Sequence, residues 1–208
     1  MTGSVIQSHW DDVYTRKPET GLSWHQAVPE PSLSILVQAG VTAASAIVDI
    51  GGGASRLADY LVSHGYRDLT VLDLSAAALA ASKSRLGAIA DRVTWIAADV
   101  TTWTPPADAF DFWHDRAAFH FLTEQSARAA YLSRLRQALR PGGQAIFGTF
   151  ALDGPDLCSG LPVVRYNAET LGAELGSAFA LTESRRHEHT TPWGSVQKFQ
   201  FSTFRFNP

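Results

Sequence analysis

An acidic residue and a run of glycines stand together where a short apolar segment ends. Asp49 lies in the apolar segment 47–50, and three glycines, residues 51–53, follow directly. The segment predicts a strand covered on both faces, and the residues from Leu57 onward have helical spacing. A strand that turns through glycine into a helix presents backbone N–H groups and the helix's positive end to a ligand. The stretch predicts a ligand-binding turn, although a purely structural turn has the same pattern.

The residues of this turn distinguish two classes of ligand. A dinucleotide-binding turn has the pattern G-x-G-x-x-G, and the third glycine position counted from Gly51 holds Arg56. Asp49 would repel a pyrophosphate but suits a ligand that carries an ammonium group. The pattern Asp49-x-Gly51-x-Gly53-x-Ser55 resembles motif I of the class I S-adenosylmethionine (SAM)-dependent methyltransferases.

Two more acids follow the next two expected strands. Asp73 ends strand 69–73, roughly 20 residues after Gly51, where a carboxylate accepts hydrogen bonds from ribose hydroxyls. Asp99 follows strand 93–97, and its segment Ala98–Val100 resembles the third cofactor motif of the same family. The resemblance implies SAM as cofactor and S-adenosylhomocysteine (SAH) as product. The expected cofactor-binding residues are Trp10, Tyr14, Trp24, Asp49, Gly51, Gly53, Ser55, Arg56, Asp73, Leu74, Asp99, Val100 and His114.

The segment 110–116 predicts a fourth strand, and its carboxyl end is polar. Ligands of open parallel sheets bind outside the carboxyl ends of the strands. We therefore expect four catalytic candidates near the reaction centre: His114, Asp115, Arg116 and His120. A general base is needed only if the nucleophile arrives protonated, and histidine has a suitable pKa for that role. Alternatively, Asp115 pairs with Arg116 or His120 and only braces the loop.

The last third of the chain holds most candidates for the methyl acceptor's site. Cys158 lies in a loop rich in Gly and Pro, where its thiol either packs in the interior or lines a pocket for a soft acceptor. The expected acceptor-binding residues are Trp24, Arg116, Phe119, Cys158, Arg165, Tyr166 and His189. One cysteine with scattered histidines lacks zinc-type spacing, so we expect no metal site.

The order of these segments resembles the same family from residue 47 to residue 150. The resemblance implies an α/β fold with a Rossmann-like, seven-stranded, mostly parallel sheet, helices on both faces and a C-terminal antiparallel hairpin. We expect the hairpin at 179–188 and 196–206, a helix at 124–139, a turn at 139–143 and a strand at 144–150. A single domain over residues 1–208 would comprise an N-terminal lid (1–45), a SAM-binding core (46–150) and an acceptor region (151–208). The N-terminal aromatic residues favour a lid, although they could simply cover an apolar edge.

Three further segments narrow the resemblance. Residues Trp113–Leu122, Cys158–Tyr166 and His189–Phe199 resemble a bacterial subgroup described as acting on small molecules, sometimes on thiols. The N-terminal segment resembles protein-lysine methyltransferases, but residues 114–116 depart from that group's pattern. The resemblance implies methyl transfer to a small nucleophilic acceptor, with a thiol or chalcogen favoured. The alternatives are a protein-lysine methyltransferase and a non-catalytic SAM- or SAH-binding protein.

The composition of the chain indicates its class, its partners and its compartment. The chain has 208 residues, of which 45% are hydrophobic and 18% charged, which indicates a globular domain. Its net charge of −3 argues against a broad nucleic-acid-binding face. The single cysteine indicates a reducing compartment, and no secretory signal or membrane-spanning run is evident. We therefore expect a cytoplasmic monomer or homodimer that binds a small molecule and neither nucleic acid nor a membrane.

Overall fold

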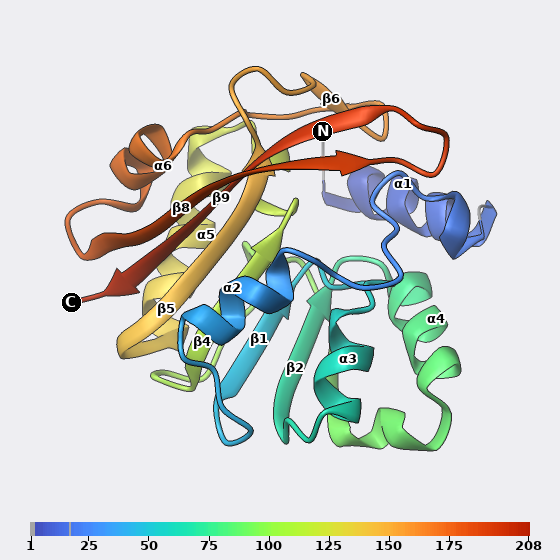
Figure 1. Ribbon diagram of the computed structural model, residues 1–208, viewed down its shortest axis with the longest axis horizontal. Helices are drawn as coiled ribbons and strands as arrows, with labels where there is room; N and C mark the ends of the chain where they lie inside the picture. Colours follow the sequence, from blue (N-terminus) through green and yellow to red (C-terminus); the bar gives the residue numbers. More distant parts are fainter. Residues whose placement is uncertain (1–2, 17) are drawn as a thin grey trace.

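The computed structural model describes residues 3–16 and 18–208 and contains a seven-stranded sheet (Figure 1). The strands lie in the order β3-β2-β1-β4-β5-β9-β8. Neighbours among β1 to β5 are parallel, whereas β9 is antiparallel to both β5 and β8. The expected fold class is therefore confirmed. The strands are β1 (Ala46–Ile50), β2 (Asp68–Asp73), β3 (Val93–Ala97), β4 (Phe110–Arg116), β5 (Leu139–Phe150), β8 (Phe179–Thr190) and β9 (Val196–Phe206).

Helices cover both faces of the sheet and divide the core in two. Val48 and Trp113 belong to the cluster that packs against α5 (Gln125–Ala138) and α6 (Ala168–Leu175). Ile47 and Phe112 belong to the opposite cluster, which includes residues of three other helices. Adjacent residues of one strand thus face opposite layers, as the alternation of a strand requires. These helices are α2 (Ser32–Gln38), α3 (Leu57–Ser63) and α4 (Ala76–Leu86).

The N-terminal helix α1 (Gly3–Arg16) contacts α4 above the carboxyl ends of the parallel strands (Figure 1). Ser75, which begins α4 by accepting from the Ala78 N–H, also donates its hydroxyl to Asp11 of α1 at 2.5 Å. This contact fixes α1 against the parallel part of the sheet. The short elements are the 3-10 helices η1 (Glu19–Gly21), η2 (Gly87–Arg92) and η3 (Phe119–Phe121), and the strand pair β6 (Leu157–Cys158) and β7 (Leu161–Pro162).

The expected turn at 139–143 is instead the beginning of β5. Leu139 already pairs with Phe110, and the register shifts between Phe110 and Phe112. Gly142, with φ of 83°, allows the backbone to follow this irregularity. The helix before it therefore ends at Ala138. The hairpin strand β8 also extends beyond the expected segment, to Thr190.

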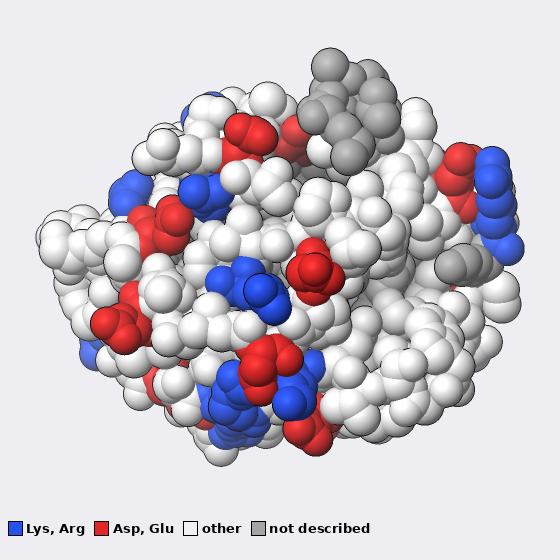
Figure 2. All heavy atoms as spheres, turned by 90° about the horizontal axis from the view of Figure 1, so that it is seen from above, with Lys and Arg blue, Asp and Glu red and all other residues white. Residues whose placement is uncertain are grey.

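Charges are interleaved on the face seen from above the carboxyl ends of the parallel strands (Figure 2). Lys and Arg side chains alternate there with Asp and Glu, and uncharged residues cover much of the surface. None of the helices in the described part of the chain has both the length and the apolar character to cross a membrane.

Candidate functional site

A cavity of about 190 Å³ lies at the carboxyl ends of β1, β2 and β4. Its wall is built from segments that are far apart in the sequence. The glycine turn after β1 and the ends of the parallel strands form one side, while α1, the loop after η1, β6 and β9 supply the other. The cavity therefore lies where ligands of open α/β sheets bind.

Two buried carboxylates lie beside the glycine turn. Asp49 is 2% exposed, and its Oδ2 has no hydrogen-bond partner among the described residues. Asp73 accepts the Ser75 N–H at 2.8 Å, and both acids line the cavity. Burial raises the pKa of Asp73 to about 7, and the charges of Asp49 and Asp11 add to this effect while backbone N–H groups oppose it. The orphaned oxygen of Asp49 suits a ligand that donates hydrogen bonds or carries positive charge.

The glycine turn leaves room for these carboxylates. A Cβ on Gly52 would lie 2.5 Å from Asp49 Oδ2, and one on Gly53 would lie 2.6 Å from Asp73 Oδ2. Gly51 has φ of 66°, which a glycine adopts without strain. Its N–H donates to Leu72 rather than to a ligand, and the Ser55 N–H donates to Gly52. Those two amides already donate within the protein. They are therefore not among the N–H groups of the turn that can bind a ligand's carboxylate.

His114 holds Asp49 in place. Its Nδ1 lies 2.7 Å from Asp49 Oδ1, and its Nε2 lies 2.9 Å from the Ser32 hydroxyl at the start of α2. Asp49 and His114 are register partners on β1 and β4, so the sheet itself brings the two side chains together. Because both ring nitrogens are engaged, neither is left to accept a proton from a substrate.

Arg116 and Cys158 also line the cavity. The Arg116 guanidinium donates to the Trp24 carbonyl at 3.2 Å and lies 5.9 Å from the Phe199 ring centre. Burial lowers the pKa of Arg116 to about 10, although the negative charge of Asp49 opposes the change. Burial raises the pKa of the Cys158 thiol to about 12, so the thiol is protonated at neutral pH.

Four aromatic rings, here called the aromatic roof, close the cavity: Trp10, Tyr14, Trp24 and Phe121. The Trp10 ring centre lies 5.8 Å from that of Trp24 and 5.1 Å from that of Phe121. Tyr14 lies 5.9 Å from Trp24. These edge-on contacts make a rigid apolar cover that keeps water from the space below.

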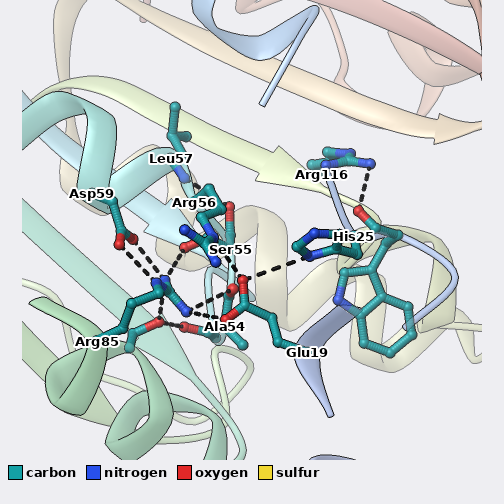
Figure 3. Close-up of polar contacts among 12 residues, drawn as sticks. Glu19, His25, Ala54, Ser55, Arg56, Leu57, Asp59, Arg85 and Arg116 are labelled. Carbon is teal, nitrogen blue, oxygen red and sulfur yellow. Dashed lines mark hydrogen bonds and ion pairs between the residues drawn. The ribbon is translucent and has the colours of Figure 1, made fainter. Parts of the chain in front are cut away.

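An ion-pair network ties η1 to the segment that follows the glycine turn (Figure 3). Glu19 accepts from Arg56 and from Arg85, each at 2.7 Å. Arg85 also pairs with Asp59 of α3 through two nitrogens and donates to the Ser55 carbonyl at 2.9 Å. Arg56 therefore lies outside the cavity wall and holds the N-terminal segment in place, a different position from the cofactor contact that its motif suggests.

The structure places Asp115 away from the cavity. It is fully buried and accepts the Tyr131 O–H at 2.6 Å and the N–H groups of Ala118 and Phe119. Burial raises the pKa of Asp115 to about 6, and these hydrogen bonds oppose the rise. His114 and Arg116 share one face of β4, and alternation along the strand turns Asp115 to the other face. Of the expected catalytic cluster, only His114 and Arg116 line the cavity.

Three more expected site residues lie in the packed interior. Phe119 and Tyr166 belong to the core cluster around α5, and their ring centres are 5.6 Å apart. His120 is fully buried, and its Nδ1 accepts the Phe150 N–H at 3.4 Å. Burial lowers the pKa of His120 to about 3, so the ring is neutral. The short helix η3 turns Phe119 and His120 inward, which their positions in the sequence do not reveal.

Two other expected acceptor-binding residues also lie off the cavity wall. Arg165 is exposed and donates to the Gly154 carbonyl at 3.1 Å. His189 is buried on β8 and donates its Nε2–H to the Ser23 carbonyl at 2.6 Å. His189 thus supports Ser23, which does line the cavity.

The sequence reasoning missed residues that reach the cavity by tertiary folding. Phe199 and Gln197 come from β9, and Ser23 comes from the loop after η1. Two further residues do not line the cavity but contact residues that shape it. Ser32 contacts His114, and Glu19 accepts from Arg56 beside the glycine turn. The remaining cavity residues that the sequence reasoning missed are small or apolar: Ile6, Ile50, Gly52, Leu72, Ala98, Ala117, Ala118, Phe121 and Leu122.

The neutral, buried His120 predicts acid sensitivity. Its pKa in the folded state lies below that of an exposed histidine, so its contribution to the free energy of unfolding is present above pH ~6.5 and is lost as the pH falls toward 3. We expect wild type to lose about 3 kcal/mol from this group between pH 7 and pH 4, and His120→Asn to lack this loss. Urea unfolding at both pH values measures the difference, with exposed His64→Asn as control. Equal pH slopes for wild type and His120→Asn would contradict the prediction.

Comparison with known proteins adds the family to this geometry. Residues 47–143 match the family model described as a methyltransferase domain. The chain therefore carries a methyltransferase domain, and this match together with the fold supports a SAM-dependent class I methyltransferase. The methyltransferase uses SAM as its cofactor. The expected recognition, type of enzyme and cofactor are therefore confirmed. No curated protein sequence matches the methyltransferase significantly.

Solved structures share its fold at low sequence identity. The 1,6-didemethyltoxoflavin-N1-methyltransferase of Burkholderia thailandensis, with its substrate and SAH bound, is 23% identical, with a TM-score of 0.69 over 99% of this chain and 86% of that one. A structure concerned with conversion of a disulfide bond into a thioacetal group during echinomycin biosynthesis is 21% identical, with a TM-score of 0.77 over 97% and 92% of the two chains. The N-methyltransferase NodS of Bradyrhizobium japonicum, with SAH, is 20% identical, with a TM-score of 0.64 over 86% and 88%.

Proposed function

We propose that this methyltransferase transfers the methyl group of SAM to a small nucleophilic acceptor inside the cavity, with a thiol or another chalcogen nucleophile favoured. The observation that carries the proposal is the orphaned, buried Oδ2 of Asp49, which lies between the glycine turn and a cavity closed by the aromatic roof. A buried polar atom without a partner is costly, and the ammonium group of SAM would satisfy it.

The cofactor would occupy the side of the cavity built by the parallel strands. Asp49 would take the ammonium group, Asp73 the ribose hydroxyls and Asp99 the adenine amino group, with Leu74 and Val100 beside the base. Asp99 Oδ1 already accepts from Thr101, so only its second oxygen would serve the ligand. Bound SAM supplies an electrophilic methyl group on a sulfonium. The glycine turn and the aromatic roof, including Trp10, Tyr14 and Trp24, would enclose it.

Methyl transfer from a sulfonium is an in-line displacement, so the protein chiefly positions the reactants and excludes water. The aromatic roof would exclude water. His114 would help to position the cofactor, because it fixes the Asp49 carboxylate. Arg116, Cys158 and Phe199 would contact the acceptor. Some neighbours in fold are described with small molecules or with sulfur chemistry, which agrees with this substrate class.

The two other functions fit the cavity less well. A lysine ammonium would have to approach the Arg116 cation, which repels it, through a cavity covered by the aromatic roof. A non-catalytic SAM-binding role gives no reason for Arg116, Cys158 and Phe199 to line the same cavity as Asp49. We also propose that residues 1–45 act as the lid, residues 46–150 as the cofactor core and residues 151–208 as the acceptor region of one domain. Residues 1, 2 and 17 of this lid lie outside the described residues.

Two measurements test the proposal. Calorimetry should show that SAM and SAH bind and NAD does not, with Asp49→Asn at least tenfold weaker than wild type and the surface variant Asp108→Asn unchanged. SAH release should then be screened over thiols, hydrogen sulfide, selenium and tellurium oxyanions, catechols and histone-like peptides. Turnover of a thiol or chalcogen is the expected result. Turnover of peptides alone would assign the protein-lysine function instead, and SAM binding without turnover of any acceptor would contradict the proposal.

A further inference from the structure

Arg116 is a partly buried cation that forms no ion pair with a carboxylate of the described residues. Among the described residues, its guanidinium makes one hydrogen bond, to the Trp24 carbonyl, and no ion pair. A guanidinium carries five N–H donors, so several of them remain available within the cavity. Burial of an unpaired charge is costly unless a ligand supplies the opposite charge. By contrast, Arg85 of α4, whose side chain is 16% exposed, has two carboxylates as partners.

The groups around Arg116 do not cancel its charge. Asp49 on β1, the carboxylate whose charge acts on Arg116, is already hydrogen-bonded to His114. His187 and His189 on β8 have pKa values lowered by burial, and the Arg116 charge lowers them further, so both rings are neutral at physiological pH.

The other titratable groups near this end of the cavity are also uncharged or already paired. Cys158 on β6 is a protonated thiol, and burial raises the pKa of Tyr14 on α1 well above its usual value. His25, on the loop that holds Trp24, lies 3.6 Å from the Glu19 carboxylate. The acceptor end of the cavity is therefore electropositive.

None of the described residues at this end of the cavity is available to take up a proton. Both nitrogens of His114 are engaged, and Asp115 and His120 lie outside the wall. The hydroxyl of Tyr14 and the thiol of Cys158 hold their protons at neutral pH. An acceptor that enters with its proton would have no base among the described residues that line the cavity near Arg116.

We propose that the acceptor binds as an anion whose deprotonated nucleophile, a thiolate or other chalcogen anion, lies against the Arg116 guanidinium. This inference rests on the proposed methyl transfer and names the charge state of its substrate. The acceptor's lone pair forms the bond to the methyl carbon while the bond from that carbon to the sulfonium breaks, and the electron pair remains on the sulfur of SAH. One negative and one positive charge disappear, and no proton moves.

The residues around Arg116 also favour a particular structure for the part of the acceptor that carries the nucleophile. Phe199 lies beside the guanidinium at 5.9 Å, and the aromatic roof supplies flat apolar walls. An aromatic thiolate satisfies both features, because its ring packs against these walls while its sulfur faces Arg116.

A chromophoric probe tests the charge state directly. Thiophenol absorbs differently in the ultraviolet as thiol and as thiolate, so its pKa when bound to SAH-loaded protein is read from a pH titration by difference spectroscopy. We expect the pKa of the bound thiol to be at least about one unit below that of the free probe, which corresponds to about tenfold preference for the anion. Its neutral methylated analogue, thioanisole, should bind at least tenfold more weakly.

Arginine variants locate the effect. Arg116→Gln should abolish the pKa shift and the preference for the anion, and Arg116→Lys should retain part of both. Arg140→Gln, a surface arginine that pairs with Asp111 at the other end of β4, is the matched control and should behave as wild type. An unshifted pKa, equal binding of the neutral analogue, or no binding of the probe to SAH-loaded wild type would each overturn the inference.

The failure of this inference is distinguishable from failure of the proposed function. SAH binding is measured first by calorimetry, and its absence would contradict the proposed function itself. Normal SAH binding together with an unshifted probe would contradict only the anionic acceptor. For acceptors that turn over, the pH at half-maximal kcat/KM should follow the acceptor's own pKa across thiols of different acidity. A fixed midpoint would indicate a protein base and would also overturn the inference.

Discussion

Asp73→Asn is expected to lower the affinity for SAM and SAH about 100-fold or more. The proposed ribose contact consists of two hydrogen bonds to a carboxylate, and hydrogen bonds to charged groups contribute about 1.5–3 kcal/mol each. A loss of about 3 kcal/mol corresponds to about 100-fold in Kd. Calorimetry with SAH measures the effect, and Asp68→Asn, at the exposed start of the same strand, serves as control. An affinity within threefold of wild type would remove Asp73 from the cofactor site.

The pH dependence of the same variant gives a second measurement. Burial raises the pKa of Asp73 to about 7 in the folded protein, above the usual value of 3.8. The folded state therefore holds an extra proton between these values, so this group's contribution to the free energy of unfolding falls as the pH rises from about 4 to 7. Because ribose hydroxyls donate to the charged form, we expect wild-type affinity for SAH to rise through pH 7. Asp73→Asn should lack both trends.

Asp115→Ala is expected to lower the free energy of unfolding by about 3 kcal/mol or more. The substitution leaves the Tyr131 hydroxyl and the Ala118 and Phe119 N–H groups without their acceptor in a fully buried site. Each buried donor left without a partner costs about 1–3 kcal/mol. Urea unfolding measures the loss, and Asp111→Ala, on the same strand with a side chain 34% exposed, should cost clearly less.

This second prediction also separates two roles for Asp115. If Asp115 only braces the loop after β4, Asp115→Asn should recover part of the stability and most of the activity of the folded protein. A stable but inactive Asp115→Asn would instead place the carboxylate in the reaction, as its position beside His114 and Arg116 in the sequence suggests.

The positions at the ends of the strands could be predicted from the sequence because local patterns determine them. Asp49, Asp73 and Asp99 each follow or end an apolar run, and parallel strands place such ends at one edge of a sheet. All three line the cavity. The direction of side chains within one strand was less evident. Residues 114–116 read as one polar cluster, but alternation turns the middle one to the opposite layer.

The rest of the site depends on contacts that sequence spacing does not encode. Ser32 at the start of α2 contacts His114 of β4, and Glu19 joins Arg56 to Arg85. Phe199 enters the cavity only because β9 lies antiparallel beside β5. Such partners become visible once the chain is folded, since each contact joins residues with no periodic relation in the sequence.

The cavity's two sides come from different stretches of the chain, and this division has an evolutionary consequence. The acids and glycines come from residues 49–99, whereas Trp10, Trp24, Cys158 and Phe199 come from outside that stretch. Mutations in the outer stretches can therefore reshape one side of the cavity while the other side is inherited unchanged. A lineage built on this plan can diversify its chemistry by exchanging peripheral segments, and a protein engineer can retarget it in the same way.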